Sequence, residues 1–333
     1  MENNDTIKEL LKDYEKKHAK ALNDLETRKQ LLYNRCPELL NIENELHTLG
    51  ISTAKCILTN NNSSHLDKLK QEIEILNNKQ KNILKKLNID ETYLKPNYEC
   101  SICNDTGYIT NNYQTVMCSC LKQKLLNIEY NKSNIYNLDK ENFDNFNFNI
   151  YSDEINKEKY NSNISPRENI KIIKKLSEEF INNFDNPDSK NLLFTGNTGL
   201  GKTFLSSCIA NELLKRGKTV LYQTAPIMLD SIIDYRFGKK NTQNICDHIY
   251  SANLLIIDDL GTETTNSMKS TELFNIINTR LLNDANNNTK TIISTNLNMK
   301  NLYDTYDERI VSRFVGHYNI CRFFGEDIRF KKI

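Results

Sequence analysis

The N-terminal part of the chain alternates apolar and polar positions with helical spacing. Ile7, Leu10 and Tyr14 recur three or four positions apart among lysines and glutamates, and the runs 38–51 and 60–87 repeat the pattern. Apolar residues at this spacing form one face of an amphipathic helix. We therefore predict two or three antiparallel helices or a short coiled coil. So polar a bundle has little core of its own, which favours a partner-binding module; a structural spacer is the alternative.

The C-terminal half alternates short apolar strands with helical runs. The runs 191–196, 219–225, 253–260 and 290–296 are apolar and are separated by longer amphipathic stretches. Strands of this kind are typical of a parallel sheet that helices cover on both faces. We therefore predict an α/β fold, with a parallel sheet flanked by helices.

These patterns divide the chain into four segments. The segment between the cysteine-rich unit and the α/β domain is polar with scattered aromatic residues, so we expect it to dock those aromatics onto the domain that follows. The predicted segments are a helical region over 1–96, a cysteine unit over 97–121, a docking segment over 122–165 and the α/β domain over 166–333.

The stretch GNTGLGKT lies between the first predicted strand of this domain and a helical run, and it matches G-x-x-x-x-G-K-[ST] in full. Its glycines let backbone amides face a phosphate, and the helix N-terminus adds partial positive charge. The lysine reaches the β- and γ-phosphates, and the hydroxyl after it binds Mg²⁺. The sequence therefore predicts a nucleoside triphosphate site. Its predicted residues are Gly196, Asn197, Thr198, Gly199, Leu200, Gly201, Lys202 and Thr203.

In the stretch LLIIDDLGTE, an apolar strand is followed directly by two adjacent carboxylates. Like charges so close repel each other unless a cation lies beside them. We predict that this cation is Mg²⁺ and that Asp258 holds it together with Thr203. Asp259 then lies where a general base orients or deprotonates the attacking water; a helix-capping or turn residue is the alternative. Glu263, just past the turn, is a candidate second carboxylate.

Two further positions fit phosphoryl chemistry. The strand at 290–296 ends on Asn296, which we expect to sense the γ-phosphate or position water, with a plain turn asparagine as the alternative. In ERIVSRF, Arg309 and Arg313 are four positions apart and share a face if the run is helical. An arginine delivered by a neighbouring subunit stabilises the charge that develops in phosphoryl transfer. We assign this role to Arg313, a surface ion-pair arginine being the alternative.

Four of the 9 cysteines crowd into a short stretch with C-x-x-C and C-x-C spacing. Four thiolates at tetrahedral reach favour a structural Zn²⁺ ion, and the NDTG turn lets backbone amides face sulfur. An iron–sulfur cluster and redox or structural thiols are the alternatives. Five other cysteines stand singly, which argues against a secreted disulfide framework. The predicted zinc ligands are Cys100, Cys103, Cys118 and Cys120.

Composition narrows the classes of function. Lys and Arg number 44 and Asp and Glu 43, so any contact with nucleic acid must rest on a local patch. No apolar run approaches the roughly 20 residues that cross a bilayer, and the polar start is unlike a secretory signal. We expect a cytoplasmic protein that makes no contact with a membrane.

The motifs GNTGLGKT, LLIIDDLG, STN and ERIVSRF, in this order, resemble those of AAA+ ATPases in the initiator and helicase-loader clade. Within it the chain looks like the DnaC/DnaI-type helicase loaders, an IstB-like ATP-binding family. The resemblance spans about 97–333, including the cysteine unit. It implies ATP as the nucleotide and slow, regulatory ATP hydrolysis. It also implies Asp259 as the catalytic acidic residue, Asn296 as sensor 1 and Arg313 as the arginine finger. The chain departs from the pattern at Asp259, where glutamate is commoner. We expect no helical lid after FFGEDIRFKKI, with Arg329 as a candidate to do some of a lid arginine's work.

The resemblance also implies partners. Such a loader binds the replicative DNA helicase, helps place it on single-stranded DNA, and self-assembles with ATP at subunit interfaces. Tyr235, Arg236, Lys239 and Lys240 offer charge and one aromatic ring to a DNA backbone, a solvated helix end being the alternative. The rival functions are a transposition helper ATPase, an ATP-binding adaptor with little hydrolysis, and a small-molecule kinase.

Overall fold

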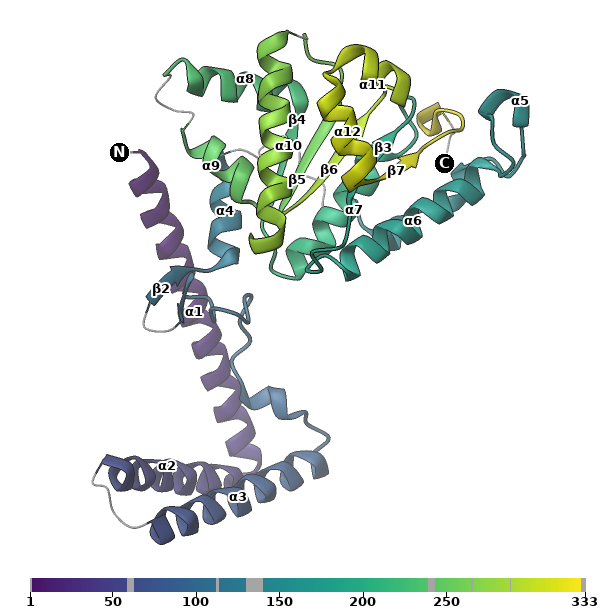
Figure 1. The fold of residues 1–333 in the computed structure, drawn as a ribbon. Helices are drawn as coiled ribbons and strands as arrows, with labels where there is room; N and C mark the ends of the chain where they lie inside the picture. The colour runs from purple at the N-terminus through teal and green to yellow at the C-terminus, as the bar shows by residue number, and fades with distance from the viewer. Residues whose placement is uncertain are drawn as a thin grey trace. The chain divides into compact units, whose positions relative to one another are not determined.

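The chain divides into two compact units, Met1–Cys118 and Ser119–Ile333 (Figure 1). The computed structural model describes residues 2–58, 63–111, 114–129, 140–238, 243–264, 266–287 and 289–330. Within these ranges, no helix is long and apolar enough to cross a membrane.

Helices dominate the first unit, which confirms the predicted helical N-terminal region. Pro37 opens the second helix, where its missing N–H has no intrahelical partner to lose. Leu32, Leu39 and Leu84, one from each long helix, form a small buried cluster. The elements of this unit are α1 (Glu2–Arg35), α2 (Pro37–Leu58), α3 (Ser63–Lys86), η1 (Glu91–Leu94), β1 (Tyr108–Asn111) and β2 (Gln114–Met117).

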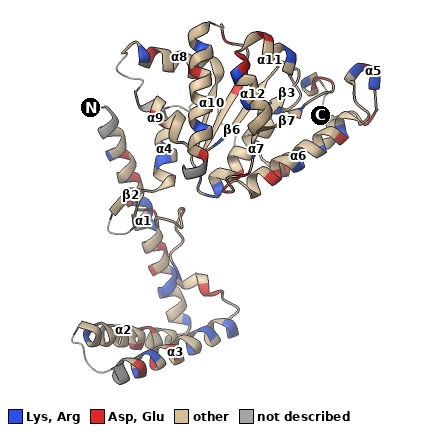
Figure 2. Ribbon diagram, viewed as in Figure 1, with Lys and Arg blue, Asp and Glu red and all other residues tan. Residues whose placement is uncertain are grey.

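The second and third helices leave apolar side chains exposed. Leu58 is 84% exposed, Ile75 66% and Ile57 58%. A groove of about 550 Å³ between α2 and α3 is lined by Leu49, Ile75 and Leu76 among polar neighbours. Figure 2 shows basic and acidic residues interspersed along α3. These helices thus expose apolar side chains as well as charged ones.

A five-stranded parallel sheet with the order β4-β5-β6-β3-β7 forms the centre of the second unit. The α/β prediction is confirmed, and each of the four predicted strands begins and ends within one residue of its predicted bounds. The strands are β3 (Asn191–Thr195), β4 (Val220–Thr224), β5 (Leu254–Leu260), β6 (Lys290–Thr295) and β7 (Tyr318–Arg322).

Helices cover both faces of this sheet (Figure 1). Alternate strand residues point to opposite faces, so Leu254 and Ile256 pack with α6 and α7, whereas Leu255 and Ile257 pack with helices α8 to α12. This double burial explains why the strands read as continuous apolar runs. The helices are α4 (Ser119–Glu129), α5 (Lys157–Tyr160), α6 (Pro166–Asn182), α7 (Lys202–Lys215), α8 (Ala225–Arg236), α9 (Gln243–Ser251), α10 (Ser267–Asn287), α11 (Met299–Thr305) and α12 (Glu308–His317), with 3-10 turns η2 (Phe143–Asn145), η3 (Phe148–Ile150) and η4 (Ile328–Phe330).

The edge strand β7 was not predicted from the sequence. It follows α12 without a break, and polar residues interrupt its apolar ones. Tyr318 and Cys321 are buried, while Asn319 and Ile320 are exposed. An edge strand packs on fewer neighbours than a central strand, so its sequence carries a weaker apolar pattern.

Two buried polar side chains fix elements around the sheet. The Gln123 amide pairs with the backbone of Val220 in both directions, at 2.7 and 3.0 Å, and so covers the edge of β4. The fully buried Arg280 donates to the carbonyls of Ile249 and Lys290, each at 2.7 Å. Burial lowers the pKa of Arg280 to about 10. Because buried carbonyls need donors, Arg280 ties the end of α9 to α10 and β6.

Aromatic residues of the segment before α6 pack on the second unit's core. Tyr151 is buried, and Phe143, Phe146 and Phe148 lie partly buried against α6 and α7. The Tyr151 hydroxyl donates to the carbonyl of Leu200 at 3.2 Å. This segment therefore reaches the loop after β3.

Candidate active site

The loop after β3 has the backbone shape of a phosphate cradle. A Cβ atom on Gly196 would lie 2.2 Å from the Phe323 carbonyl oxygen, and one on Gly199 would lie 2.0 Å from an Asp327 carboxylate oxygen. The backbone oxygen excludes a larger residue at Gly196, and a left-handed φ of 71° disfavours one at Gly199. Gly201 precedes α7 and offers no side-chain cap, which leaves the first amides of this helix for an anion.

Lys202 is buried at the start of α7, with 5% of its surface exposed. Its Nζ atom donates to the carbonyls of Gly196 at 2.6 Å and Asn197 at 2.8 Å, and to Oδ1 of Asn296 at 2.8 Å. Burial lowers its pKa to about 8, and the nearby Asp259 and Asp258 oppose this shift. The lysine thus lies between the phosphate loop and the end of β6.

Asp258 is buried and lies beside Thr203. The Thr203 hydroxyl donates to Oδ2 of Asp258 at 3.1 Å. Two residues that the sequence reasoning missed also donate to this carboxylate: the Tyr222 hydroxyl to Oδ2 at 2.6 Å, and the Ser294 hydroxyl to Oδ1. The sequence signal for Tyr222 and Ser294 is a polar group inside an otherwise apolar strand. Such a signal does not say which residue the polar group will contact.

Asp259 lies at an irregularity of the sheet. The pairing of β5 with β6 shifts between Ile257 and Leu260, and Asp259 takes a φ of 56°, in the left-handed region. Its amide donates to Oδ1 of Asp258 at 3.1 Å and to the Ser294 hydroxyl at 3.2 Å. Burial and the Asp258 charge raise the pKa of the Asp259 carboxyl. The bulge thus turns Asp259 out of the apolar layer.

A cavity of about 440 Å³ collects most of these groups. A carboxylate and a hydroxyl are oxygen ligands that suit Mg²⁺, and uncapped amides beside a buried lysine suit phosphates. The residues therefore fit a magnesium–nucleotide complex, whose metal ion Thr203 and the adjacent Asp258 could hold. The lining residues are Glu141, Thr198, Gly199, Leu200, Gly201, Lys202, Thr203, Phe204, Asp259, Asn296, Ile328 and Arg329.

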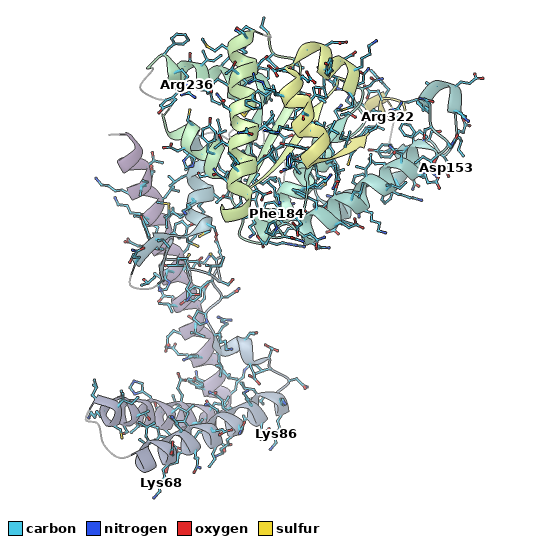
Figure 3. All side chains as sticks on the ribbon, viewed as in Figure 1. Lys68, Lys86, Asp153, Phe184, Arg236 and Arg322 are labelled. Atoms are coloured by element: carbon cyan, nitrogen blue, oxygen red, sulfur yellow. The ribbon has the colours of Figure 1, made fainter. Side chains whose placement is uncertain are left out.

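The C-terminal segment lies against the loop, which the sequence indicated only weakly. The amide of Ile328 donates to the Gly199 carbonyl at 2.9 Å, and Arg329 lines the cavity. Arg329 pairs with Asp327 at 2.6 Å. A second cavity, of about 700 Å³, is also lined by loop residues, among them Asn197, and by Arg322 of β7. Figure 3 labels Arg322.

Glu263 and Arg313 do not line the loop cavity. Both carboxylate oxygens of Glu263 accept hydrogen bonds, from the Gly261 amide at 2.9 Å and from the Tyr306 hydroxyl. Arg313 is half-buried on α12, and its Nε atom donates to Oδ1 of Asn278 on α10 at 3.2 Å. Glu263 is therefore tied into the turn after β5, while Arg313 is placed away from its own chain's cavity.

Two of the arginines singled out from the sequence, Arg309 of ERIVSRF and Arg236 of the candidate DNA-binding residues, each form an ion pair with a carboxylate. Arg309 lies 2.9 Å from Asp307 and over the Phe274 ring, with 4.7 Å between the guanidinium carbon and the ring centroid. Arg236, labelled in Figure 3, lies 3.0 Å from Glu272. Tyr235 is 36% exposed. Lys239 and Lys240 lie outside the described residues.

The four clustered cysteines converge as predicted. Their sulfur atoms all lie within 4.8 Å of one another, with 3.9 Å between Cys100 and Cys118. Distances of this order fit tetrahedral ligation of one ion by four thiolates.

A tight turn shapes the cysteine cluster. Asn104 and Asp105 take left-handed φ values of 51° and 56°, and the amide of Gly107 then points at the Cys103 sulfur at 3.3 Å. The Asp105 carboxylate accepts from the amide of Cys100 at 2.8 Å. An amide that faces sulfur stabilises a thiolate, so the turn suits a metal-bound form.

Parts of the chain are similar to known proteins of DNA replication. The replicative helicase loader DnaC of Escherichia coli is 27% identical over 138 residues, which make up 41% of this chain and 54% of that protein. The chromosomal replication initiator protein DnaA of Aquifex aeolicus is 32% identical over 139 residues, 41% of this chain and 33% of that protein. A crystal structure of the DnaC helicase loader matches at 21% identity with a TM-score of 0.41, covering 54% of this chain and 96% of the other. The chain thus spans about half the length of the DnaC protein it matches.

The family comparison covers more of the sequence. The profile of the IstB-like ATP binding proteins matches residues 147–332, more than half of the chain. This range includes the phosphate loop, both aspartates, Asn296 and Arg313. The chain therefore belongs to the family of IstB-like ATP binding proteins.

Proposed function

We propose that this chain is an ATP-controlled loader, which binds the replicative DNA helicase and helps place it on single-stranded DNA in the cytoplasm. The similarity to DnaC supports the replication role. The observation that carries the proposal is the meeting of Lys202, Asp259 and Asn296 at one cavity beside the Thr203–Asp258 pair.

In this proposal the phosphate loop holds the triphosphate. The amides at the start of α7 bind phosphate oxygens, and Lys202 exchanges its loop carbonyls for the β- and γ-phosphates. Thr203 and Asp258 would hold a magnesium ion, which would supply charge neutralisation on the phosphates. Asn296 stays beside Lys202 and orients the γ-phosphate or the attacking water.

Asp259 acts on the water. The water oxygen forms a bond to the γ-phosphorus while the bond to the β–γ bridging oxygen breaks, and Asp259 accepts the water proton. Arg313 of a neighbouring copy stabilises the charge that develops on the phosphoryl group. An aspartate is one methylene shorter than the glutamate common at this position, so we expect slow hydrolysis that serves as a switch.

The N-terminal unit is the proposed grip on the helicase. Its exposed apolar side chains on α2 and α3 would gain free energy by burial against a partner. A zinc ion held by the four cysteines would supply folding free energy to the hairpin of β1 and β2. Tyr235 and Arg236 are the described part of the proposed DNA-binding patch, where a phosphate would compete with Glu272 for Arg236.

Retention of purified replicative helicase tests the proposal. The full chain and a truncated chain lacking residues 1–121 would be immobilised and challenged with helicase in ATP, in ADP and without nucleotide. We expect retention by the full chain and loss on truncation. Absence of retention by the full chain in every nucleotide state would remove the loader function.

The transposition helper ATPase is the second candidate, because the matching family profile is the IstB-like one. A helper of this class would bind a transposase instead of a helicase. The same retention experiment with a transposase as the soluble partner separates the two functions.

A further inference from the structure

The Asp258 carboxylate receives four donors, and only one of them belongs to the phosphate-loop motif. Oδ2 accepts from Thr203 at 3.1 Å and from Tyr222 at 2.6 Å. Oδ1 accepts from the Ser294 hydroxyl and from the Asp259 amide at 3.1 Å. Three hydroxyls and one amide thus fix both oxygens of the proposed magnesium ligand.

Tyr222 reaches this carboxylate from the neighbouring strand. It lies on β4 opposite Ile256, in parallel register, so Asp258 is two residues further along the adjacent strand on the same face. The ring is 2% exposed and belongs to the apolar layer under the sheet, with Ile256. A phenylalanine would fill the same space, so the hydroxyl is the group that the packing does not explain.

Ser294 reaches the same carboxylate from the other side. It lies on β6, next to Ile293, which is the last residue paired before the shift in β5. Its hydroxyl donates to Asp258 and accepts from the Asp259 amide at 3.2 Å. Ser294 therefore fixes the bulge that gives the two aspartates their different directions.

The two donors on Oδ2 differ in what they do when metal binds. The Thr203 hydroxyl would also serve as a ligand of the magnesium ion, through a lone pair of its oxygen. Tyr222 does not line the cavity, so its hydroxyl would remain a donor to Oδ2. From this division we infer that Tyr222 and Ser294 are positioning residues, which hold Asp258 in the orientation of a magnesium ligand.

This inference rests on the proposed nucleotide site, and its test uses binding rather than turnover. A fluorescent ATP analogue is titrated into the full chain, first in EDTA and then at fixed analogue concentration with increasing Mg²⁺. In Tyr222→Phe, we expect affinity in EDTA within about twofold of the parent. The Mg²⁺ concentration that gives half of the metal-dependent gain should rise about tenfold, as for the loss of one hydrogen bond to a charged group.

Tyr318→Phe is the matched control. Tyr318 is also a buried tyrosine of this sheet, 3% exposed, but it lies on the edge strand β7. The control should lose a buried hydroxyl without any change in the Mg²⁺ requirement. Ser294→Ala is the second variant, and it keeps the inference testable if Tyr222→Phe does not fold, as judged by its thermal unfolding.

The outcomes distinguish a failure of the inference about Tyr222 and Ser294 from a failure of the proposed nucleotide site. An unchanged Mg²⁺ requirement in Tyr222→Phe, or in Ser294→Ala where that variant stands in, overturns the inference and leaves the proposed site intact. Equal loss of affinity in EDTA and in Mg²⁺ would also overturn it, because it would mark a merely structural role. A parent chain that fails to bind the analogue in either condition would overturn the proposed function together with the inference.

Discussion

The Nζ atom of Lys202 lies 2.8 Å from Oδ1 of Asn296, so the start of α7 and the end of β6 are joined across the candidate site. Lys202 also donates to two carbonyls of the loop. The lysine's three donors are therefore engaged by groups of the protein. In the proposed function a triphosphate would replace some of these contacts, and Asn296 would sense whether the exchange has occurred.

Asn296→Ala should reduce hydrolysis more than binding. The amide is expected to contact the γ-phosphate or the water most strongly in the transition state, so we expect turnover to fall by about tenfold to a hundredfold and ATP affinity to change by less than about threefold. The measurements are steady-state phosphate release and equilibrium binding of an ATP analogue. Asn319→Ala, an exposed asparagine on β7, is the control. Equal losses in affinity and turnover would contradict the assigned role.

ATP binding should take up a proton in alkaline solution. Burial lowers the pKa of Lys202 to about 8 in the free protein, and a bound triphosphate raises it again by favouring the charged form. Above about pH 8 the free lysine is largely neutral and the bound lysine charged. Affinity should then fall with increasing pH, with a limiting slope of about tenfold per pH unit.

Calorimetric titrations in two buffers with different ionisation enthalpies count the protons. Close to one proton should be taken up at about pH 9. Lys190→Gln, which removes an exposed lysine just before β3, should leave this number unchanged. Proton release, or the same count at pH 7 and pH 9, would contradict a buried lysine that charges on binding.

Asp259→Asn should separate binding from hydrolysis. Asparagine adopts the left-handed conformation as readily as aspartate, so the φ of 56° is preserved, but an amide cannot accept the water proton. We expect ATP hydrolysis to fall by at least about a hundredfold, with analogue binding retained. Asp304→Asn changes an exposed carboxylate on α11 and serves as the control. A parental rate in the Asp259 variant would remove this residue from the mechanism.

The cysteine cluster should carry one zinc ion per chain. The sulfur geometry and the amide directed at Cys103 both favour a bound metal. Cys103→Ser should lower the zinc content to well below one ion per chain and reduce the thermal stability of the first unit. Cys36→Ser, at a half-buried lone cysteine, should keep both. Metal analysis that finds iron, or no metal in the parent chain, would contradict the zinc assignment.

The parts of the fold that local pattern determines could be predicted. β3, β4, β5 and β6 are buried on both faces, so each is a continuous apolar run. The phosphate loop and the Asp258–Asp259 pair are also contiguous in sequence, and their chemistry depends on spacing. β7 carried too weak a pattern because it lies at an edge.

Contacts that depend on strand register could not be predicted. Ser294 and Tyr222 meet Asp258 only because β4, β5 and β6 pair as they do, and because a bulge shifts β5. Glu263 lies close to Asp259 in sequence, yet Tyr306, 43 residues away, takes one of its oxygens. No short-range pattern carries that information. The role proposed for Arg313 would depend on a neighbouring copy, which a single chain's sequence does not place.

The affinity of the full chain for the replicative helicase, measured with an ATP analogue, with ADP and without nucleotide, tests the central claim most directly. Lys202→Ala would be measured beside it, because this variant removes the contact between nucleotide and site but leaves the N-terminal unit unchanged. The account predicts helicase binding whose strength differs between ATP and ADP states in the parent and is independent of nucleotide in Lys202→Ala. Helicase binding of equal strength in all three states of the parent, or none in any, would contradict an ATP-controlled loader.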